Sequence, residues 1–303
     1  MGRTGQGNHA VKLIDTHLHL WDTRRFRYPW FQEEAFPELP DTYGLDQAIA
    51  DAGDTTTAFV VVQAEVDHGA DSVEETKWMQ EIADNHTDGS RLAGFVGYAD
   101  LARPDIEQIL ERHAKYPIFR GIRQEIWWKR PSPRADILED DLLARSDWRQ
   151  GFESLSRVDA TFDLTCWHWQ LGPFATFLVD HPRVTVVVDH LGSPIAGDTD
   201  AFQTWVRGVR DLAALPNTFM KISGLSQADA HWKVESIRPF VLEVLEAFGP
   251  ARCMLGSNFP PEKLSSTYTD VRSAFETLLA ELTHNEREKL FFQTSAEVYR
   301  LEN

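Results

Sequence analysis

Short runs of apolar and β-branched residues alternate with longer amphipathic segments along almost the whole chain, and this repeat limits the fold more than any other feature. Eight runs occur, spaced on average about 35 residues apart, the length of a strand with its crossover helix. They cover residues 11–16, 56–62, 92–98, 119–126, 161–166, 184–188, 218–222 and 253–256. Because runs such as 184–188 are almost wholly apolar, they favour a parallel sheet buried on both faces.

Helical periodicity fills the gaps between the runs. The expected helices cover residues 72–84, 104–114, 148–157, 174–180, 201–215 and 237–248, followed by 268–282, 286–292 and 296–301. Eight strand and helix units predict an α/β protein with the (β/α)8 TIM-barrel fold, and a doubly wound sheet is the alternative. No linker divides the chain, so we expect one domain over residues 1–303, with a frayed N-terminus at residues 1–10.

Charge and composition narrow the possible partners. Lys and Arg number 30 against 47 Asp and Glu, which gives a formal net charge of −17. This charge repels phosphate backbones and anionic lipid, so neither nucleic acid nor a membrane is an expected partner. The chain has no apolar signal core near its start and only two cysteines, Cys166 and Cys253, outside any CxxC pair. We therefore expect a cytoplasmic protein with a small-molecule substrate, and a homodimer remains open.

Two segments depart from the strand and helix pattern. Residues 24–40 are rich in aromatic residues and proline, and residues 127–135 read WWKRPSPRA. Both follow predicted strands, at the face of a (β/α)8 barrel where active sites lie. We interpret them as rim or lid loops, with plain surface insertions as the alternative.

Polar side chains follow several of the apolar runs at the same end. Strict alternation along the first strand would put Asp15, His17 and His19 on one face. Two neutral imidazoles at a spacing of two residues can converge on one cation, so His17 and His19 are candidate metal ligands. Other runs end in Arg123 and Glu125, in His168, in Asp189 and His190, and in Asn258. A catalytic face at the carboxyl ends of the strands explains this placement.

Six segments together carry a family likeness. They are DTHLHLWD at 15–22, FRGIRQ at 119–124, HWQL at 168–171, VDHLG at 188–192, KISG at 221–224 and GSNFP at 256–260. In this order the chain resembles the amidohydrolase superfamily, specifically the amidohydrolase-2 group that contains sugar-acid lactonases. The resemblance implies a (β/α)8 barrel, hydrolysis of a carbonyl ester or lactone, and in many members one divalent metal, often zinc.

The resemblance also implies roles for individual residues. His17 and His19 match the ligand pair of the first strand, His168 the fifth-strand position and His190 the sixth-strand histidine. Glu125 is a further candidate ligand. Because some relatives work without a metal, a second arrangement stays open, in which His17, His19 and His168 polarise the carbonyl by hydrogen bonds.

The eighth strand departs from the family pattern. Relatives commonly carry an Asp there that takes the proton from the attacking water, whereas this chain has Asn258. A neutral amide cannot act as that base. We rank His190 first as the base, because an imidazole has an ordinary pKa near neutrality, with Glu262 as the alternative.

Substrate recognition needs cationic, hydrogen-bonding and aromatic groups near the barrel mouth. The candidates are Gln63, Arg123, Lys221, Trp127 and the Lys129 and Arg130 pair. A structural ion pair of Arg123 with Glu125 or Glu65 is the competing interpretation for that arginine.

The sequence thus predicts a hydrolase that opens a sugar-acid 1,4-lactone or a related carboxylated lactone by water attack on the ring carbonyl. Two alternatives remain. One is a metal-dependent decarboxylase of an unsaturated carboxylic acid on the same barrel, and the other is an inactive, ligand-binding barrel, suggested by Asn258.

Overall fold

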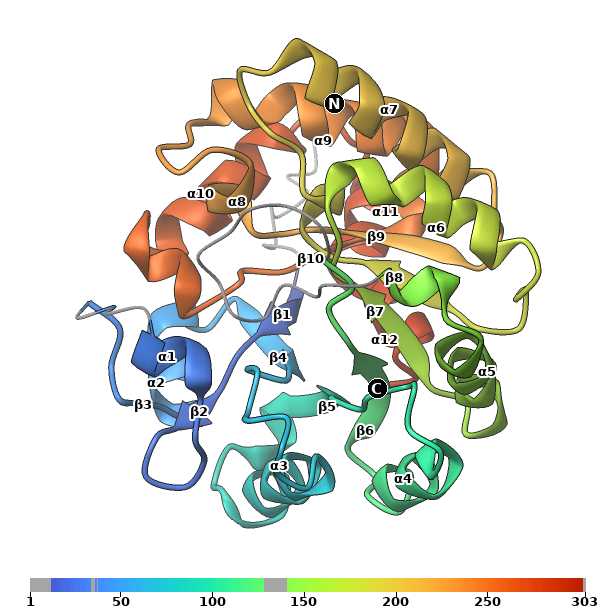
Figure 1. Cartoon of the computed structure of the whole chain (residues 1–303). Coiled ribbons are helices and arrows are strands. Elements are labelled where there is room, and N and C mark those ends of the chain that lie inside the picture. Colours follow the sequence, from blue (N-terminus) through green and yellow to red (C-terminus); the bar gives the residue numbers. More distant parts are fainter. Residues whose placement is uncertain (1–11, 34–35, 37, 128–140, 302–303) are drawn as a thin grey trace, which may run out of the picture.

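Eight parallel strands form one sheet in the computed structural model, which describes residues 12–33, 36, 38–127 and 141–301. Neighbouring strands in the sheet follow the order β1, β4, β5, β6, β7, β8, β9 and β10 (Figure 1). Their bounds are β1 Leu13–Leu18, β4 Thr56–Val62, β5 Leu92–Gly97, β6 Phe119–Arg123, β7 Thr161–Leu164, β8 Val186–Val188, β9 Thr218–Ile222 and β10 Cys253–Leu255. All eight predicted strands are present, with ends shifted by up to three residues.

The chain that follows β10 returns to β1 and nearly closes the barrel. Leu18 and Phe259 form a parallel bridge. The backbone N–H of Asn258 donates to the His17 carbonyl at 2.7 Å, and the N–H of His19 donates to the Phe259 carbonyl at 2.7 Å. The (β/α)8 prediction is therefore confirmed, and the doubly wound alternative is wrong.

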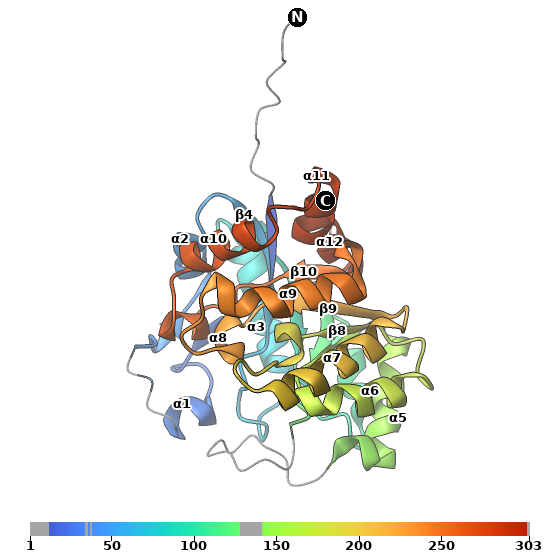
Figure 2. The ribbon, with the colours of Figure 1, turned by 90° about the horizontal axis from the view of Figure 1, so that it is seen from above.

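Helices surround the strands on the outside of the barrel (Figures 1 and 2). The helices in the predicted positions are α3 Val73–Asn85, α4 Ile106–His113, α5 Ser146–Ser154, α6 Leu171–Leu178, α7 Thr199–Ala213, α9 Val234–Phe248, α10 Tyr268–Leu278, α11 His284–Glu288 and α12 Thr294–Val298. Three short helices were not predicted: α1 Pro29–Glu33, α2 Leu45–Ala52 and α8 Leu225–Ala228. Strands β2 Trp21–Asp22 and β3 Thr42–Tyr43 form a small antiparallel pair that frames α1. No helix of the described residues is both long and apolar enough to cross a membrane.

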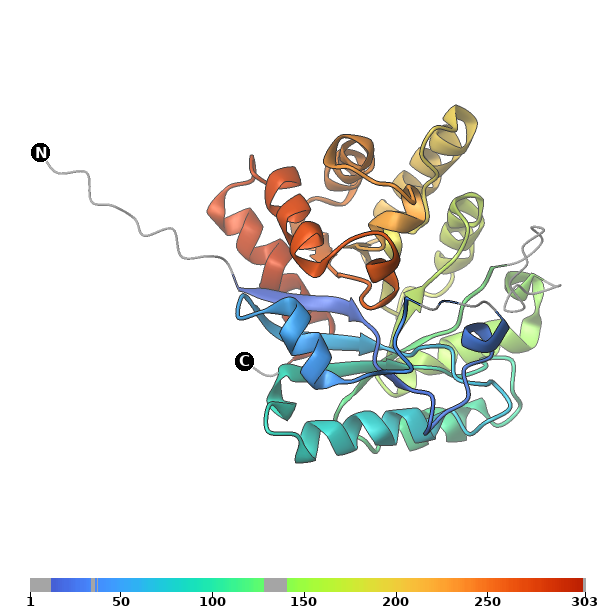
Figure 3. The same ribbon diagram turned by 90° about the vertical axis from the view of Figure 1, so that its left-hand side faces the viewer.

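The two ends of the barrel differ. At the end where the strands begin, Val298, Tyr299 and Leu301 of the C-terminal segment pack with interior strand residues such as Ile14 and Val187. Helix α1 lies at the opposite end, beyond the points of the strand arrows (Figure 3). Among the described residues, the C-terminal segment thus fills the barrel interior at the first end.

Strand β1 does not alternate strictly, which corrects one expectation. Its register against β4 shifts between Asp15 and Leu18. Asp15 accepts a hydrogen bond from the Tyr268 hydroxyl of α10 at 2.8 Å, whereas His17 contacts Asp189 after β8. The side chains of Asp15 and His17 therefore lie on different sides of the strand, because a register shift changes the face on which each following side chain lies.

The two irregular segments are described only in part. Residues 24–40 contain α1, and Trp30, Phe36 and Leu39 of this stretch line a cavity at the barrel mouth. The expected loop at 127–135 lies outside the described residues except for Trp127, and so do the Lys129 and Arg130 pair and the N-terminus at residues 1–10.

Helix α3 buries a carboxyl group, Glu75, whose Oε1 accepts a hydrogen bond from the Ala64 N–H at 3.2 Å. Burial raises the pKa of Glu75 from 4.5 to about 8. Between these two values the folded chain holds a proton that the unfolded chain has lost, so the free energy of unfolding falls as the pH rises through this window. We expect Glu75→Gln, which cannot ionise, to raise the melting temperature relative to wild type, by a margin that grows from about pH 5 to about pH 8.

Thermal unfolding followed by circular dichroism over a pH series measures this margin. Glu74→Gln is the matched control, because the Glu74 side chain on the same helix is half exposed. Its difference from wild type should stay nearly constant over the series. A pH-independent difference for Glu75→Gln would contradict the prediction.

Candidate active site

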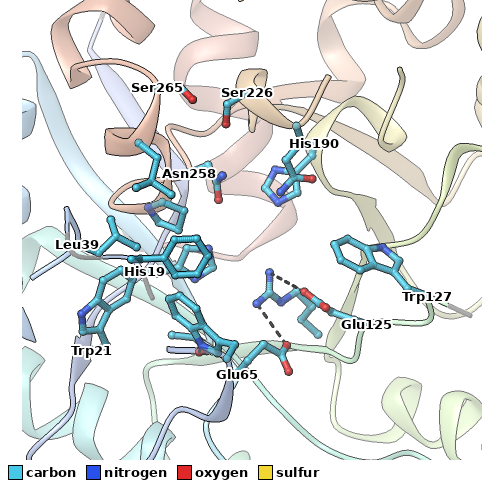
Figure 4. Close-up of a pocket in the computed structure, with 17 residues that line it drawn as sticks. His19, Trp21, Leu39, Glu65, Glu125, Trp127, His190, Ser226, Asn258 and Ser265 are labelled. Atoms are coloured by element: carbon cyan, nitrogen blue, oxygen red, sulfur yellow. Dashed lines mark hydrogen bonds and ion pairs between the residues drawn. The ribbon is translucent and has the colours of Figure 1, made fainter. Parts of the chain in front are cut away.

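A cavity of about 270 Å³ opens at the carboxyl ends of the strands (Figure 4). Its polar lining is His19, Glu65, Arg123, Glu125, His190, Ser226, Gln227, Asn258 and Ser265. Its apolar lining is Trp21, Trp30, Phe36, Leu39, Ala64, Trp127, Pro261 and Leu264. The cavity thus combines a polar floor with aromatic and aliphatic walls, as small-molecule sites commonly do.

His17 lies beneath this floor, fully buried, at the end of β1. Its Nδ1 is 3.1 Å from Asp189 Oδ1, and its Nε2 has no hydrogen-bond partner among the described residues. The ring centroid of His17 is 4.9 Å from that of His19 and 4.3 Å from that of His190. Burial lowers the pKa of His17 well below its usual value despite the Asp189 carboxylate. The ring is therefore neutral. Its Nδ1 also lies 3.3 Å from Lys221 Nζ, and in the tautomer whose Nδ1–H donates to Asp189 the lone pair is on Nε2.

His19 lines the cavity itself. Its Nδ1 lies 2.9 Å from the Val62 carbonyl and 3.1 Å from the Gln63 carbonyl. Because carbonyl oxygens only accept, Nδ1 carries the proton and Nε2 is left with a lone pair. Burial, reinforced by the charge of Arg123, lowers the pKa of His19 to about 4. His19 is thus a neutral imidazole at neutral pH.

His190 follows β8 in a left-handed backbone conformation, with φ at 52°. Its Nδ1 lies 3.0 Å from the Ser223 hydroxyl, which leaves Nε2 as the other ring nitrogen. Burial lowers the pKa of His190 to about 3 despite the neighbouring Asp189 carboxylate, which corrects the expectation of a near-neutral pKa on which its rank as the base rested. Gly224 makes room for the ring, because a Cβ at that position would lie 2.4 Å from His190 Nδ1.

A buried charge network supports these rings from below. Lys221 Nζ lies 2.6 Å from Asp163 Oδ2 and 3.1 Å from Asp189 Oδ1, with all three side chains fully buried. The Tyr299 hydroxyl also donates to Asp163 at 2.8 Å, and Thr165 donates to Asp189 at 2.8 Å. Lys221 was predicted to bind substrate, but the structure places it under the floor, where its charge is already paired.

Potential metal ligands gather at the same place. His17, Asp189 and His190 each offer one ligand atom, and these atoms lie within 4.8 Å of one another. Neutral imidazoles and a carboxylate suit a divalent ion such as zinc. Of the four predicted ligands only His17 belongs to this group, and His19, His168 and Glu125 are not part of it. His168 is buried at the start of a 3₁₀ turn outside the cavity lining, and Glu125 lines the cavity.

Asn258 and Glu262 form the wall that follows β10. Asn258 adopts a left-handed conformation with φ at 59°, and its side chain hydrogen-bonds with those of His19 and Glu262. Glu262 accepts hydrogen bonds from the Ser226 N–H at 3.0 Å, the Ser226 hydroxyl at 2.8 Å and Trp232 Nε1 at 2.9 Å. The alternative base Glu262 is thus fully buried behind Asn258, outside the cavity lining, where its carboxylate holds α8 in place.

Arg123 pairs with two carboxylates, Glu65 at 3.5 Å and Glu125 at 3.9 Å, which are both labelled in Figure 4. Its Nη2 donates to the Gln63 carbonyl at 2.7 Å. The Gln63 side chain, predicted to bind substrate, is fully buried and instead donates to Glu65. The ion pairs that competed with the substrate role of Arg123 are therefore present, and Arg123 lines the cavity as well.

Sequence reasoning gave no catalytic or binding role to Glu65, Asp163, Asp189 or Ser223. Glu65 sits three residues beyond the second run with φ at 57°, a conformation that a strand pattern does not reveal. Asp163 lies inside an apolar run, and a charged residue at an interior strand position was a usable signal for the buried network. Trp127 does line the cavity, and its ring stacks on Trp167 with centroids 4.8 Å apart.

Comparison with known proteins gives a consistent result. The family model described as Amidohydrolase matches residues 14–301. An uncharacterized protein, y4mH of Sinorhizobium fredii, is 35% identical over 96% of this chain and 99% of its own length. An L-fucono-1,5-lactonase of Burkholderia multivorans is 32% identical over 95% of this chain and 96% of its own length.

Solved structures agree. A crystal structure of an amidohydrolase from Burkholderia multivorans with bound zinc is 30% identical, with a TM-score of 0.80, and the match covers 96% of this chain and 100% of that chain. Since the family match spans nearly the whole chain and the relatives exceed 30% identity, the protein belongs to the amidohydrolase family.

Proposed function

We propose that the protein is a lactonase that opens a sugar-acid lactone or a related lactone by water attack on the ring carbonyl. The observation that carries this proposal is the cluster of three neutral histidines, His17, His19 and His190, whose ring centroids lie 4.3 and 4.9 Å apart at the base of the cavity. The similarity to an L-fucono-1,5-lactonase supports the same reaction class.

His190 is the proton carrier in this proposal. Its ring is neutral before reaction, and in the tautomer whose Nδ1–H donates to the Ser223 hydroxyl, Nε2 can accept a proton from the attacking water while the oxygen bonds to the carbonyl carbon. The Asp189 carboxylate stabilises the imidazolium that forms, as carboxylates behind catalytic histidines do. His190 then returns the proton to the ring oxygen as its bond to the carbonyl carbon breaks. Lactone and water thus give one hydroxy acid.

His17 and His19 fit a divalent metal, for which we propose zinc. The His17 Nε2 is buried without a partner among the described residues, and the His19 Nδ1 bonds leave the lone pair of that ring on Nε2, next to the Asn258 side chain. When bound there, the ion would polarise the carbonyl or lower the pKa of a water molecule. Asp189 would orient His17 through Nδ1, which is the usual carboxylate support of a histidine ligand.

We expect removal of the metal to lower activity by about tenfold or more, and zinc to restore it. The protein would be dialysed against a chelator, its metal content measured by mass spectrometry, and its rate assayed before and after adding back zinc or magnesium. Magnesium, which prefers oxygen ligands, is the control and should restore less. Full activity in a metal-free sample would contradict the metal assignment.

A pH-indicator screen of aldonolactones, L-fucono-1,5-lactone, pyrones and muconolactones tests the function itself. Hydrolysis of a lactone from this set supports the proposal. Release of carbon dioxide from an unsaturated carboxylic acid, with no lactone opened, would replace it with the decarboxylase alternative. Ligand binding without turnover in either assay would indicate an inactive barrel.

A further inference from the structure

One wall of the active-site cavity consists of aromatic and aliphatic side chains. It comprises Trp21, Trp30, Phe36, Leu39, Pro261 and Leu264, and we call it the apolar wall. Figure 4 shows Trp21 and Leu39 of this wall on the opposite side of the cavity from Glu125 and Trp127. The apolar wall thus lies away from the Glu125 carboxylate.

We propose that the apolar wall is a subsite for an alkyl substituent of the substrate, so that the protein takes lactones whose ring carries a nonpolar side chain of several carbons. This inference rests on the proposed lactonase function and names its substrate class. The lactone carbonyl would lie at the histidines, and the substituent would extend along the apolar wall toward solvent.

The apolar wall runs from the base of the cavity to its opening. Trp21, two residues beyond His19, is only 1% exposed, and Leu39 is also buried. The ring centroids of Trp21 and Trp30 lie 5.6 Å apart. Leu264 lines the same cavity and is 43% exposed. A chain of methylene groups that starts beside His19 would therefore stay in contact with carbon until it passes Leu264.

The aromatic and aliphatic parts of the apolar wall are joined through Tyr43 of β3. The ring centroid of Tyr43 is 6.2 Å from that of Trp21, and Lys263 Nζ lies 5.2 Å from the centroid of the Tyr43 ring. The Tyr43 hydroxyl and Lys263 Nζ also both lie 2.6 Å from Asp51 Oδ2. These contacts hold residues 261–264 on the same side of the cavity as Trp21.

The apolar wall favours carbon over hydroxyl groups. The indole N–H of Trp21 already donates to the Pro40 carbonyl at 2.8 Å. That of Trp30 donates to the Ala64 carbonyl at 2.8 Å. A substrate hydroxyl buried here would lose hydrogen bonds to water and gain none from these indoles or from Leu39. A methylene group in the same place removes apolar surface from water, which is favourable.

The test measures kcat/KM for uncharged γ-lactones that differ only in their alkyl substituent, from methyl through ethyl and butyl to hexyl. We expect kcat/KM to rise about three- to fourfold for each added methylene group, the effect of its burial, until the chain passes Leu264. Because the ring and its charge are constant, a bound metal ion and the ion pairs of Arg123 act equally on the whole series. The hydroxymethyl lactone is the polar counterpart of the ethyl lactone, and its kcat/KM should be about tenfold lower.

Two variants shorten the apolar wall at separate points. Leu39→Ala and Leu264→Ser should each reduce the rise per methylene group to about twofold or less, because each removes carbon that the substituent would contact. Leu242→Ser is the matched control and should keep the wild-type rise, since Leu242 on α9 is 50% exposed and lies outside the cavity lining. A flat or falling series in wild type, a preference for the hydroxymethyl lactone, or an unchanged rise in both wall variants would overturn the subsite.

Calorimetric binding of the matching alkyl lactams, whose amide resists ring opening, separates the subsite from the lactonase reaction. Affinity that rises with chain length, together with an increasingly negative heat capacity change, supports the subsite even if no lactone is hydrolysed, and the lactonase proposal alone then fails. Affinity that does not depend on chain length would overturn the subsite. Hydrolysis of the methyl lactone would in that case leave the lactonase proposal standing.

Discussion

Replacement of His190 by Gln should lower kcat by about 10²- to 10⁴-fold, the range that a positioned general acid or base contributes. The expected loss of kcat follows from the hydrogen bonding of the His190 imidazole. In the tautomer whose Nδ1–H donates to the Ser223 hydroxyl at 3.0 Å, Nε2 is the nitrogen that can carry a proton to and from the substrate. Steady-state kinetics on the best lactone of the screen, with KM measured separately, gives the size of the loss.

The metal content of the variants decides which role His190 plays. His17→Gln and His19→Gln should lose most of the bound metal, whereas His190→Gln should retain it and lose turnover. His190 offers a ligand atom to the group of His17, Asp189 and His190, whose ligand atoms lie within 4.8 Å of one another. The metal content of His190→Gln therefore distinguishes a metal ligand from a base. Loss of metal from His190→Gln would make His190 a ligand and remove it as the base, and unchanged kcat would remove it from the chemistry.

Replacement of Lys221 by Met should lower the free energy of unfolding by about 3–5 kcal/mol, the cost of breaking a buried ion pair by removing one partner. Lys221 lies 2.6 Å from Asp163 and 3.1 Å from Asp189, and none of the three side chains is exposed. Methionine fills a similar volume but leaves two buried carboxylates without their cation. Urea unfolding followed by tryptophan fluorescence and circular dichroism measures the change.

Lys77→Met on α3 is the matched control. Lys77 pairs with Glu74 at 3.5 Å on the surface, where both side chains are about half exposed, so we expect a change of no more than about 1 kcal/mol. A Lys221→Met variant as stable as this control would show that Asp163 and Asp189 are held well enough by their other partners, among them Tyr299, Thr165 and His17.

The strand pattern predicted the barrel well because parallel strands buried on both faces leave an unmistakable apolar run, as in β4 Thr56–Val62. It was weaker for short elements. Helix α1 Pro29–Glu33 has five residues, too few for a helical period to emerge. The β2 and β3 pair has two residues in each strand and gives no alternation at all.

Site residues were predicted from their positions at the ends of strands. Such a position does not show whether a side chain lines the cavity or is buried beneath it. His19 and Arg123 line the cavity, whereas Lys221 and Gln63, at similar places near strand ends, are fully buried beneath or beside it. Asp15 was misplaced for another reason, since the register shift in β1 cannot be read from an alternating pattern. Such local irregularities depend on contacts with residues such as Tyr268, far along the chain.

The seam between the first and last strands has a consequence for biosynthesis. The carbonyl of His17 and the N–H of His19 are bonded to Asn258 and Phe259, so two of the three histidines gain their final backbone partners only when residues some 240 positions later arrive. A ribosome-bound chain that lacks this last segment would have the outer strands and yet no formed histidine cluster. The backbone that holds His17 and His19 would therefore be completed only near the end of synthesis, when Asn258 and Phe259 are added.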